Sequence, residues 1–311
     1  MPENRARRRG NVTLEVRDVY KSFGQVRAVQ GVSFTVPEGR VCGLLGSNGA
    51  GKTTTMRIIM RIFLPDRGEI RWQGRPVTDA VRASFGYLPE ERGLYPKMQV
   101  REQLIYLTQL KGHTQAEAAR QVDLWIDRLE LGEYARRKVE QLSKGNQQKV
   151  QFAAAAASRP ALCILDEPFT GLDPMNTLVM EQAFRTLAAE GTTILFSSHN
   201  MDQVEALCDD VVLIHRSRVV LAGSLREVKR SARRQTVRLR VESGDYGFLR
   251  EFPGIRTQSA TGGAIEIAVP EGLDPNRLLA RALQTGTVTE YSLGEPSLRE
   301  IYIEKVGGAD A

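Results

Sequence analysis

Short apolar stretches alternate with longer, mostly polar segments over the first two thirds of the chain. The apolar runs have the length of buried strands, and apolar residues recur at helical spacing in the segments between them. The runs lie at residues 12–16, 32–36, 41–45, 162–165, 193–196 and 211–214. This alternation predicts an α/β domain built on a mostly parallel sheet.

The pattern changes twice along the chain. Between about residues 97 and 160 no strand-like run occurs, so we expect a helical subdomain inserted into the sheet domain. After residue 240 short alternating runs at 236–242 and 264–270 accompany helix-like segments at 275–285 and 295–306. These indicate a separate small α+β domain. The predicted organisation is a basic flexible tail over 1–11, a core domain over 12–230 and an accessory domain over 235–311.

Composition narrows the class of protein. A chain of 311 residues with 41% hydrophobic and 26% charged residues is typical of a globular protein of about two domains. No apolar run approaches the roughly 18–20 residues that a membrane-spanning helix needs. Cys42, Cys163 and Cys208 have no metal-binding spacing, and two of them sit in apolar runs. We therefore expect reduced cysteines and a cytoplasmic location.

The net charge of +6 is concentrated in the tail and in residues 225–240. Such basic runs are able to contact anionic lipid or nucleic acid. The alternative is a disordered tail and a solvated linker, which is the more common origin of a charged run. We favour this second interpretation and expect no nucleic-acid partner.

Candidate chemistry begins after the run at 41–45. Gly46-x4-Gly51-Lys52-Thr53 is a P-loop, placed between a predicted strand and a predicted helix as this motif requires. Small residues keep side chains away from backbone N–H groups that bind phosphate, and the helix N-terminus favours the negative charge. Lys52 is expected to lie between the β- and γ-phosphates and Thr53 to offer its hydroxyl to Mg²⁺. The predicted nucleotide-binding residues of this loop are Gly46, Ser47, Asn48, Gly49, Ala50, Gly51, Lys52, Thr53 and Thr54.

Two further strand ends carry polar side chains. Asp166 and Glu167 follow the run at 162–165, and because adjacent strand residues point to opposite faces, the two carboxylates have different roles. Asp166 is expected to hold Mg²⁺ through water, and Glu167 to accept a proton from the attacking water. His199 follows the run at 193–196, where it is placed to hold the γ-phosphate or to orient water. Asp173 lies in a predicted turn, as a helix cap or as a contact with a neighbour.

Together these motifs resemble the ATP-binding subunits of ABC transporters. The order is P-loop, "LSKGN" at 142–146, "ILDEP" at 164–168, "GLD" at 171–173 and "SSH" at 197–199. The resemblance implies a P-loop ATPase core with a mixed sheet and an inserted helical subdomain. It also implies bound ATP and Mg²⁺, and a second ATPase subunit, identical or different. The signature Ser143, Lys144, Gly145 and Asn146 and the loop residue Asp173 then face that second subunit. The helix that begins near Gln147 aims its N-terminus at the same nucleotide. The resemblance also places Phe23 beneath the adenine.

The chain departs from the family pattern at several positions. Lys144 replaces a glycine and Asn146 a glutamine of the signature, Ser47 stands where proline is common, and Glu90 occupies the place of a glutamine expected to ligate Mg²⁺. Since Lys52, Glu167 and His199 are intact, we expect ATP hydrolysis.

The terminal segment "EPSLREIYIEKVG" at 295–307 is similar to the C-terminal domain of bacterial exporter ATPases of the sodium-extrusion and drug-export type. It implies an exporter subunit, cytoplasmic and peripheral on the inner face of the membrane, that drives separate transmembrane permeases. Alternatives are a soluble ABC-type ATPase and a weakly hydrolysing, ATP-gated scaffold. The space between P-loop and signature is too short for the long coiled coil of DNA-repair members. Translation-associated members carry two cassettes, and this chain has one P-loop.

Overall fold

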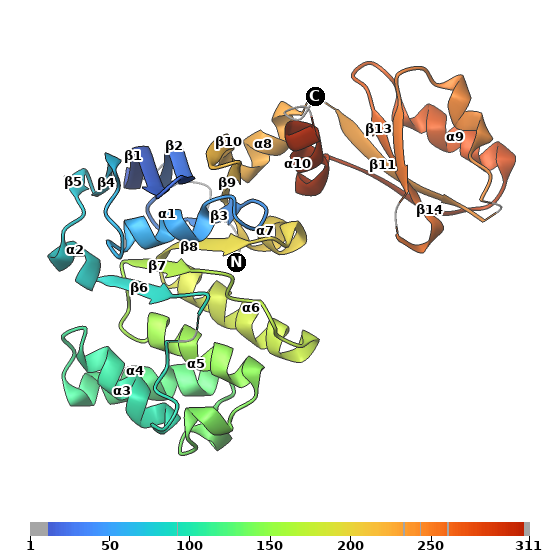
Figure 1. Ribbon diagram of the computed structural model, residues 1–311. Helices are drawn as coiled ribbons and strands as arrows, with labels where there is room; N and C mark the ends of the chain where they lie inside the picture. Colours follow the sequence, from blue (N-terminus) through green and yellow to red (C-terminus); the bar gives the residue numbers. More distant parts are fainter. Residues whose placement is uncertain (1–11, 92, 233, 243, 260, 308–311) are drawn as a thin grey trace. The chain divides into compact units, whose positions relative to one another are not determined.

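The computed structural model describes residues 12–91, 93–232, 234–242, 244–259 and 261–307 (Figure 1). The basic tail expected over residues 1–11 lies outside this part of the chain. The chain separates into two compact units, Met1–Gly223 and Ser224–Ala311, which are described one at a time. The division precedes residue 230, so that the helix after Ser224 lies in the second unit.

A six-stranded sheet forms the centre of the first unit. Its strand order is β10-β9-β3-β8-β7-β6, and the pairs β9–β3, β3–β8, β8–β7 and β7–β6 are parallel. Two residues separate β9 from β10. Because so short a turn joins only antiparallel strands, β10 runs antiparallel to β9. The strands are β3 (Val41–Leu45), β6 (Phe85–Leu88), β7 (Leu162–Leu165), β8 (Thr193–Ser198), β9 (Asp210–His215) and β10 (Arg218–Ser224). Every residue of β3, β7 and β8 is buried, as expected for a sheet covered on both faces.

The strand directions of the core domain are mixed, as the family resemblance implies, because the first strands form a second, antiparallel sheet. Its order is β2-β1-β4-β5, with bounds β1 (Val12–Phe23), β2 (Val26–Pro37), β4 (Arg67–Trp72) and β5 (Arg75–Pro76). A short turn joins β1 to β2, so these two strands pair directly with each other, in an irregular register. Buried residues of this sheet, of the helix α1 (Lys52–Ile59) and of the parallel sheet form one apolar cluster, which fixes the P-loop helix between the two sheets.

The helices of the first unit surround the parallel sheet. A group of them, drawn green in Figure 1, falls within residues 97–160. Its members are α3 (Val100–Gln109), α4 (Gln115–Arg128), η1 (Gly132–Tyr134), η2 (Val139–Gln141) and α5 (Lys144–Ala156). At Gly86 of β6 an added Cβ would lie 2.2 Å from the carbonyl oxygen of Ala155, so glycine lets α5 approach the sheet closely. The remaining helices are α2 (Asp79–Ala83), α6 (Pro174–Ala189) and α7 (Met201–Leu207).

The second unit is a small antiparallel sheet with helices. The sheet order is β12-β13-β11-β14, and apolar side chains on one face of β11 and β13 pack with α9 and η3 in a core of their own. The elements are α8 (Leu225–Ser231), β11 (Gln235–Val241), η3 (Gly247–Glu251), β12 (Arg256–Ser259), η4 (Thr261–Gly263), β13 (Ile265–Val269), α9 (Pro275–Thr285), β14 (Val288–Gly294) and α10 (Leu298–Gly307). The predicted α/β core accompanied by a small α+β unit is confirmed. Within the described ranges, no helix combines the length and the apolar character needed to cross a membrane.

Candidate nucleotide-binding and hydrolysis site

Four neighbouring parallel strands lead into the predicted site residues. β3 runs into the P-loop at Gly46, β8 into His199, β7 into Asp166 and Glu167, and β6 into the segment that holds Glu90. Because parallel strands end at the same edge of a sheet, segments far apart in sequence meet there. A pocket of about 500 Å³ opens at this edge, and its walls are Val26, Arg27, Ala28, Asn48, Gly49, Gly51, Lys52, Thr53, Thr54, Glu90, Glu167, Thr170 and His199.

The P-loop has the backbone conformation that binding of phosphate requires. Gly51 has φ +105°, and a Cβ on it would lie 2.4 Å from the carbonyl oxygen of Ala28. Only glycine combines that backbone conformation with such a close approach. α1 begins at Lys52, has no acidic residue in its first turn, and directs its N-terminus into the pocket. The loop therefore places a glycine-rich backbone and a helix N-terminus at the pocket, an arrangement that favours an anion.

Lys52 is held by its own loop. It is 6% exposed, and its Nζ donates hydrogen bonds to the carbonyl oxygens of Gly46, at 2.8 Å, and Ser47, at 3.2 Å. These bonds hold the ammonium at the pocket wall. A phosphate group that enters the pocket meets a cation already in position, which reduces the entropy lost on binding.

Asp166 and Glu167 have different environments, as their opposite orientations predict. Asp166 is fully buried, and its Oδ1 accepts a hydrogen bond of 2.6 Å from the hydroxyl of Ser197. Its Oδ2 is buried without a hydrogen-bond partner among the described residues. Glu167 lines the pocket with a side chain that is 13% exposed.

The carboxylate of Glu167 is fixed by two side chains. Its Oε2 lies 2.9 Å from Nδ1 of His199 and accepts a hydrogen bond of 3.2 Å from the hydroxyl of Thr170. Its backbone has φ +51°, an uncommon conformation for a residue other than glycine, and such strain is concentrated at functional sites. A backbone bond of 3.2 Å from Thr170 N to the Glu167 carbonyl closes the turn. His199, predicted to contact phosphate or water, here contacts Glu167.

Three residues of the site escaped sequence reasoning. Ser197 bridges the Asp166 carboxylate and the backbone N–H of Glu167, Thr170 holds the Glu167 carboxylate, and Arg27 lines the pocket from β2. Ser197 is the first of two serines that end β8, and its contacts with Asp166 and Glu167 arise because β8 lies beside β7. Thr170 lies three residues after Glu167, so predicting a turn at this point would have placed Thr170 next to the Glu167 side chain.

Phe23 lies at the end of β1, on the same side of the pocket as β2. Its side chain is 43% exposed and packs edge-on against Phe63, with ring centroids 5.1 Å apart. Nζ of Lys21 lies 5.6 Å from the ring centroid. The described residues that form the pocket wall on this side are Val26, Arg27 and Ala28, without Phe23. The contact of Phe23 with the adenine therefore stays a prediction, because Phe23 is not among the described residues that line the pocket.

The signature residues lie at the start of α5, outside the pocket wall. Ser143 caps this helix by accepting a hydrogen bond of 3.2 Å from the N–H of Asn146. The helix therefore begins at Lys144, and the expectation that it begins near Gln147 is wrong because the cap lies earlier. Ser143 and Lys144 are exposed, whereas Gly145 and Asn146 are buried. The first pair is thus accessible to another molecule, and the second pair packs inside this chain.

Asp173 caps α6. Its Oδ1 accepts a hydrogen bond of 2.9 Å from the N–H of Asn176, and its Oδ2 one of 2.6 Å from the Asn176 side chain. These donors lower the pKa of the Asp173 carboxyl below its usual value. Of the two predicted roles of Asp173, capping is the one seen within this chain.

The residues at this edge of the sheet suit Mg²⁺ that is bound together with a nucleotide. No group of three metal-ligating side chains occurs among the described residues, so a fully protein-made metal site is not found in that part of the chain. Mg²⁺ is commonly bound by one or two carboxylates together with substrate phosphates. The partnerless Oδ2 of Asp166 and the pocket-lining Thr53 and Glu90 provide ligands of this kind.

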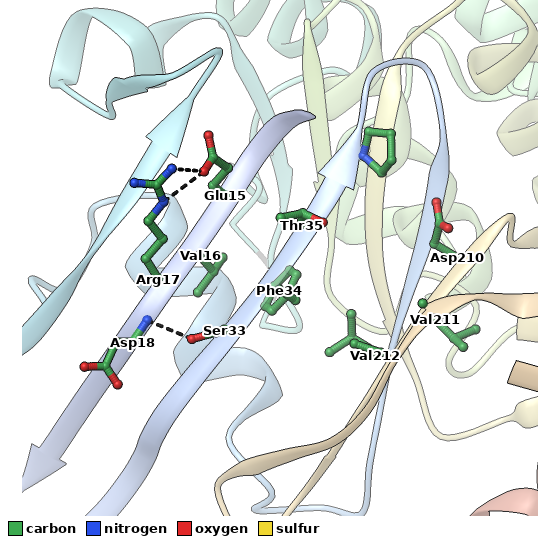
Figure 2. A pocket seen from close by; sticks show the side chains of 13 residues that line it. Glu15, Val16, Arg17, Asp18, Ser33, Phe34, Thr35, Asp210, Val211 and Val212 are labelled. Atoms are coloured by element: carbon green, nitrogen blue, oxygen red, sulfur yellow. Dashed lines mark hydrogen bonds and ion pairs between the residues drawn. The ribbon is translucent and has the colours of Figure 1, made fainter. Parts of the chain in front are cut away.

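A second pocket of about 540 Å³ lies elsewhere in the first unit, between β1, β2, β9 and β10. Figure 2 shows Arg17 paired with Glu15, and the backbone of Asp18 bonded to the hydroxyl of Ser33, along its wall. Its wall is formed from strand faces and contains none of the predicted site residues. It therefore lacks the P-loop and the pair of Glu167 and His199 that distinguish the pocket at the strand ends.

Comparison with known proteins agrees with this geometry. A family model described as ABC transporter matches residues 29–170, and a model described as "ATP-binding protein DrrA1-3-like, C-terminal domain" matches residues 223–306. The chain is 43% identical to the uncharacterized ABC transporter ATP-binding protein YhaQ of Bacillus subtilis (strain 168), over 94% of this chain and 98% of that protein.

Two further similarities are informative. Nod factor export ATP-binding protein I of Paraburkholderia xenovorans (strain LB400) is 36% identical over 68% of this chain and 70% of that protein. A solved structure of the ATP binding subunit of an ABC transporter superposes with a TM-score of 0.66 and 32% identity, over 71% of this chain and 93% of that one. The full-length match, the family model and the pocket geometry together show that this chain belongs to the ABC transporter family, as an ATP-binding ATPase subunit.

Proposed function

We propose that this subunit hydrolyses ATP in the pocket at the strand ends, with Glu167 as the general base. The observation that carries the proposal is the convergence of the P-loop, Glu167 and His199 on that one pocket. A pocket-lining carboxylate held at Oε2 by His199 and Thr170 keeps its other oxygen to accept a proton from water. Lys52 and the N–H groups of the P-loop bind the phosphates and stabilise the negative charge that moves during the reaction.

Mg²⁺ is the proposed cofactor together with ATP. When bound, it neutralises charge on the phosphate oxygens that are to be transferred and released. Thr53, Asp166 and Glu90 are the residues proposed to hold it. Asp166 supports this role because one of its oxygens is buried with no partner in the described structure, which is costly for a carboxylate without a cation.

We propose further that a second ATPase subunit completes the site. Ser143 and Lys144 are exposed at the capped start of α5, and an exposed helix N-terminus with an added cation attracts a phosphate group. The buried Gly145 and Asn146 support that helix start from inside. Asp173 is proposed to lie at the same junction between subunits.

The proposed physiological role is export through separate membrane subunits, at the cytoplasmic face of the membrane. A relative that carries export in its name, matched over 70% of its length, supports this direction. The match of residues 223–306 to the C-terminal domain of a DrrA1-3-like ATP-binding protein also supports it. To test this role, the subunit is co-expressed with a membrane protein that is encoded beside it. We expect the subunit to sediment with membranes only when that membrane protein is present. Sedimentation without that protein would contradict the proposed partner.

Glu167→Gln tests the hydrolytic function directly. The substitution removes the proton acceptor and keeps the side-chain size, so we expect ATP hydrolysis to fall by about 10²-fold or more, while binding of a fluorescent ATP analogue persists. Glu190→Gln is the matched control, because Glu190 pairs with Arg128 at the opposite end of the sheet. Unchanged hydrolysis in the Glu167 variant would remove this residue from its role.

A further inference from the structure

A serine inside the core sheet joins the carboxylate of Asp166 to the backbone of Glu167. Ser197 is fully buried on β8, beside the end of β7. Its Oγ donates a hydrogen bond to Oδ1 of Asp166 at 2.6 Å and accepts one from the backbone N–H of Glu167 at 2.9 Å. One hydroxyl thus satisfies a buried carboxylate oxygen and a backbone donor of the next residue.

Each of these two bonds has a physical consequence for the site. The bond to Asp166 is short, at 2.6 Å, and it restricts rotation of the carboxyl group. The bond from Glu167 N supports a backbone whose φ of +51° is unusual for glutamate. Without the hydroxyl, Oδ1 of Asp166 and the N–H of Glu167 would each lose a hydrogen bond, with no replacement seen among the described residues.

We propose that Ser197 is a positioning residue for ATP hydrolysis. Its hydroxyl sets the orientation of Asp166 and Glu167 relative to each other, so that one carboxylate stays below the pocket wall while the other faces the pocket. Ser197 does not line the pocket and acts only through these two residues. The inference rests on the proposed function, since it requires that Glu167 takes part in hydrolysis.

A positioning role and a purely structural role make different predictions. Loss of any buried hydrogen bond lowers stability, so stability alone does not separate them. Thr193 provides a matched control on the same strand. It is 1% exposed, and its hydroxyl accepts a hydrogen bond of 3.0 Å from the N–H of Gly39 at the opposite end of β8. Thr193→Ala therefore removes a buried hydrogen bond without touching the carboxylate pair.

The decisive experiment measures kcat, KM, equilibrium ATP binding and melting temperature for the full chain and its variants. For Ser197→Ala we expect kcat to fall by about tenfold to a hundredfold, the usual effect of losing a hydrogen bond to a charged group, with ATP binding changed by less than about twofold. Thr193→Ala is expected to lower the melting temperature while kcat is retained.

A second pair of variants keeps the test valid if Ser197→Ala fails to fold. Threonine and valine at position 197 add similar volume to the core, and only threonine keeps the hydroxyl. We expect Ser197→Thr to retain most of the wild-type kcat and Ser197→Val to lose it. Equal kcat in these two variants, or wild-type kcat in a folded Ser197→Ala, would overturn the proposal. Glu167→Gln is measured alongside, because full activity of that variant would refute the proposed function itself.

Discussion

The six-stranded sheet of the first unit and the four-stranded sheet of the second unit carry their charged side chains in different places. In the parallel sheet every residue of β3, β7 and β8 is buried, and charged side chains appear only where the strands end. In the sheet of the second unit, β11 alternates, with Val237, Leu239 and Val241 inside and Arg238 and Arg240 on the other face. A sheet covered on both faces has room for chemistry only at its ends, whereas a half-covered sheet carries charges along its strands.

The charges on the second sheet pair with each other. Arg238 Nε lies 2.6 Å from one oxygen of Glu290, Arg240 Nη2 lies 2.9 Å from the other oxygen, and Glu266 approaches Arg238 at 3.9 Å. These are cross-strand neighbours, which stabilise a sheet face. Glu167, which follows β7, faces a pocket in contrast, and among the described residues its Oε1 has no ion-pair partner. The charged side chains of the second sheet therefore stabilise the sheet, whereas Glu167 is available for a reaction in the pocket.

The largest expected effect concerns binding at the end of the parallel sheet. Lys52→Ala removes a positioned cation from the phosphate site, and we expect ATP affinity to fall by about a hundredfold or more, since buried charge contacts commonly contribute several kcal/mol. Lys111→Ala is the control, because Nζ of Lys111 also donates to a backbone carbonyl, that of Phe85, but at the opposite end of this sheet. Titration with a fluorescent ATP analogue measures both. Equal ATP affinities of the two variants would contradict the placement of the ATP site at these strand ends.

The next effect tests whether the second unit has a core of its own. Leu239 is fully buried in its apolar cluster, so Leu239→Ala is expected to cost about 2–5 kcal/mol of unfolding free energy in this unit. Leu293, 44% exposed on β14, is the matched control, with an expected change below about 0.5 kcal/mol. Urea unfolding monitored with and without ATP measures both. Loss of ATP affinity in the Leu239 variant would show that ATP binding by the first unit depends on the core of the second unit.

The smallest effect concerns the charged face. Glu290→Gln leaves two arginines without their shared carboxylate, and we expect a loss of about 0.5–1 kcal/mol in the stability of the second unit, which shrinks at 1 M salt. Glu266→Gln should have a weaker effect, because its contact is longer. The readout is the urea midpoint at low and high salt. A loss that is independent of salt would mean that packing, and not charge, holds this face together.

Sequence patterns predicted the parallel sheet and its strand ends better than anything else. Buried parallel strands are continuous apolar runs, and the P-loop spacing defines both a strand end and a helix start. The strand β4 was not predicted because its sequence "RGEIRW" mixes charged and apolar residues and resembles a loop. The role of Ser197 follows from strand order, and a single sequence contains no direct record of which strands are neighbours.

The signature segment has a consequence that reaches beyond its own helix. A Cβ on Gly145 would lie 3.2 Å from Nδ2 of Asn176, and this same nitrogen donates to Asp173. Three residues farther along the helix, Gln148 donates a hydrogen bond of 3.1 Å to the carbonyl of Pro168, the neighbour of Glu167. One rigid helix thus links the exposed Ser143 to the loop that carries the proposed base. We expect contact of the proposed second subunit with the start of α5 to change the position of Glu167. Contact between subunits would then control when ATP is hydrolysed.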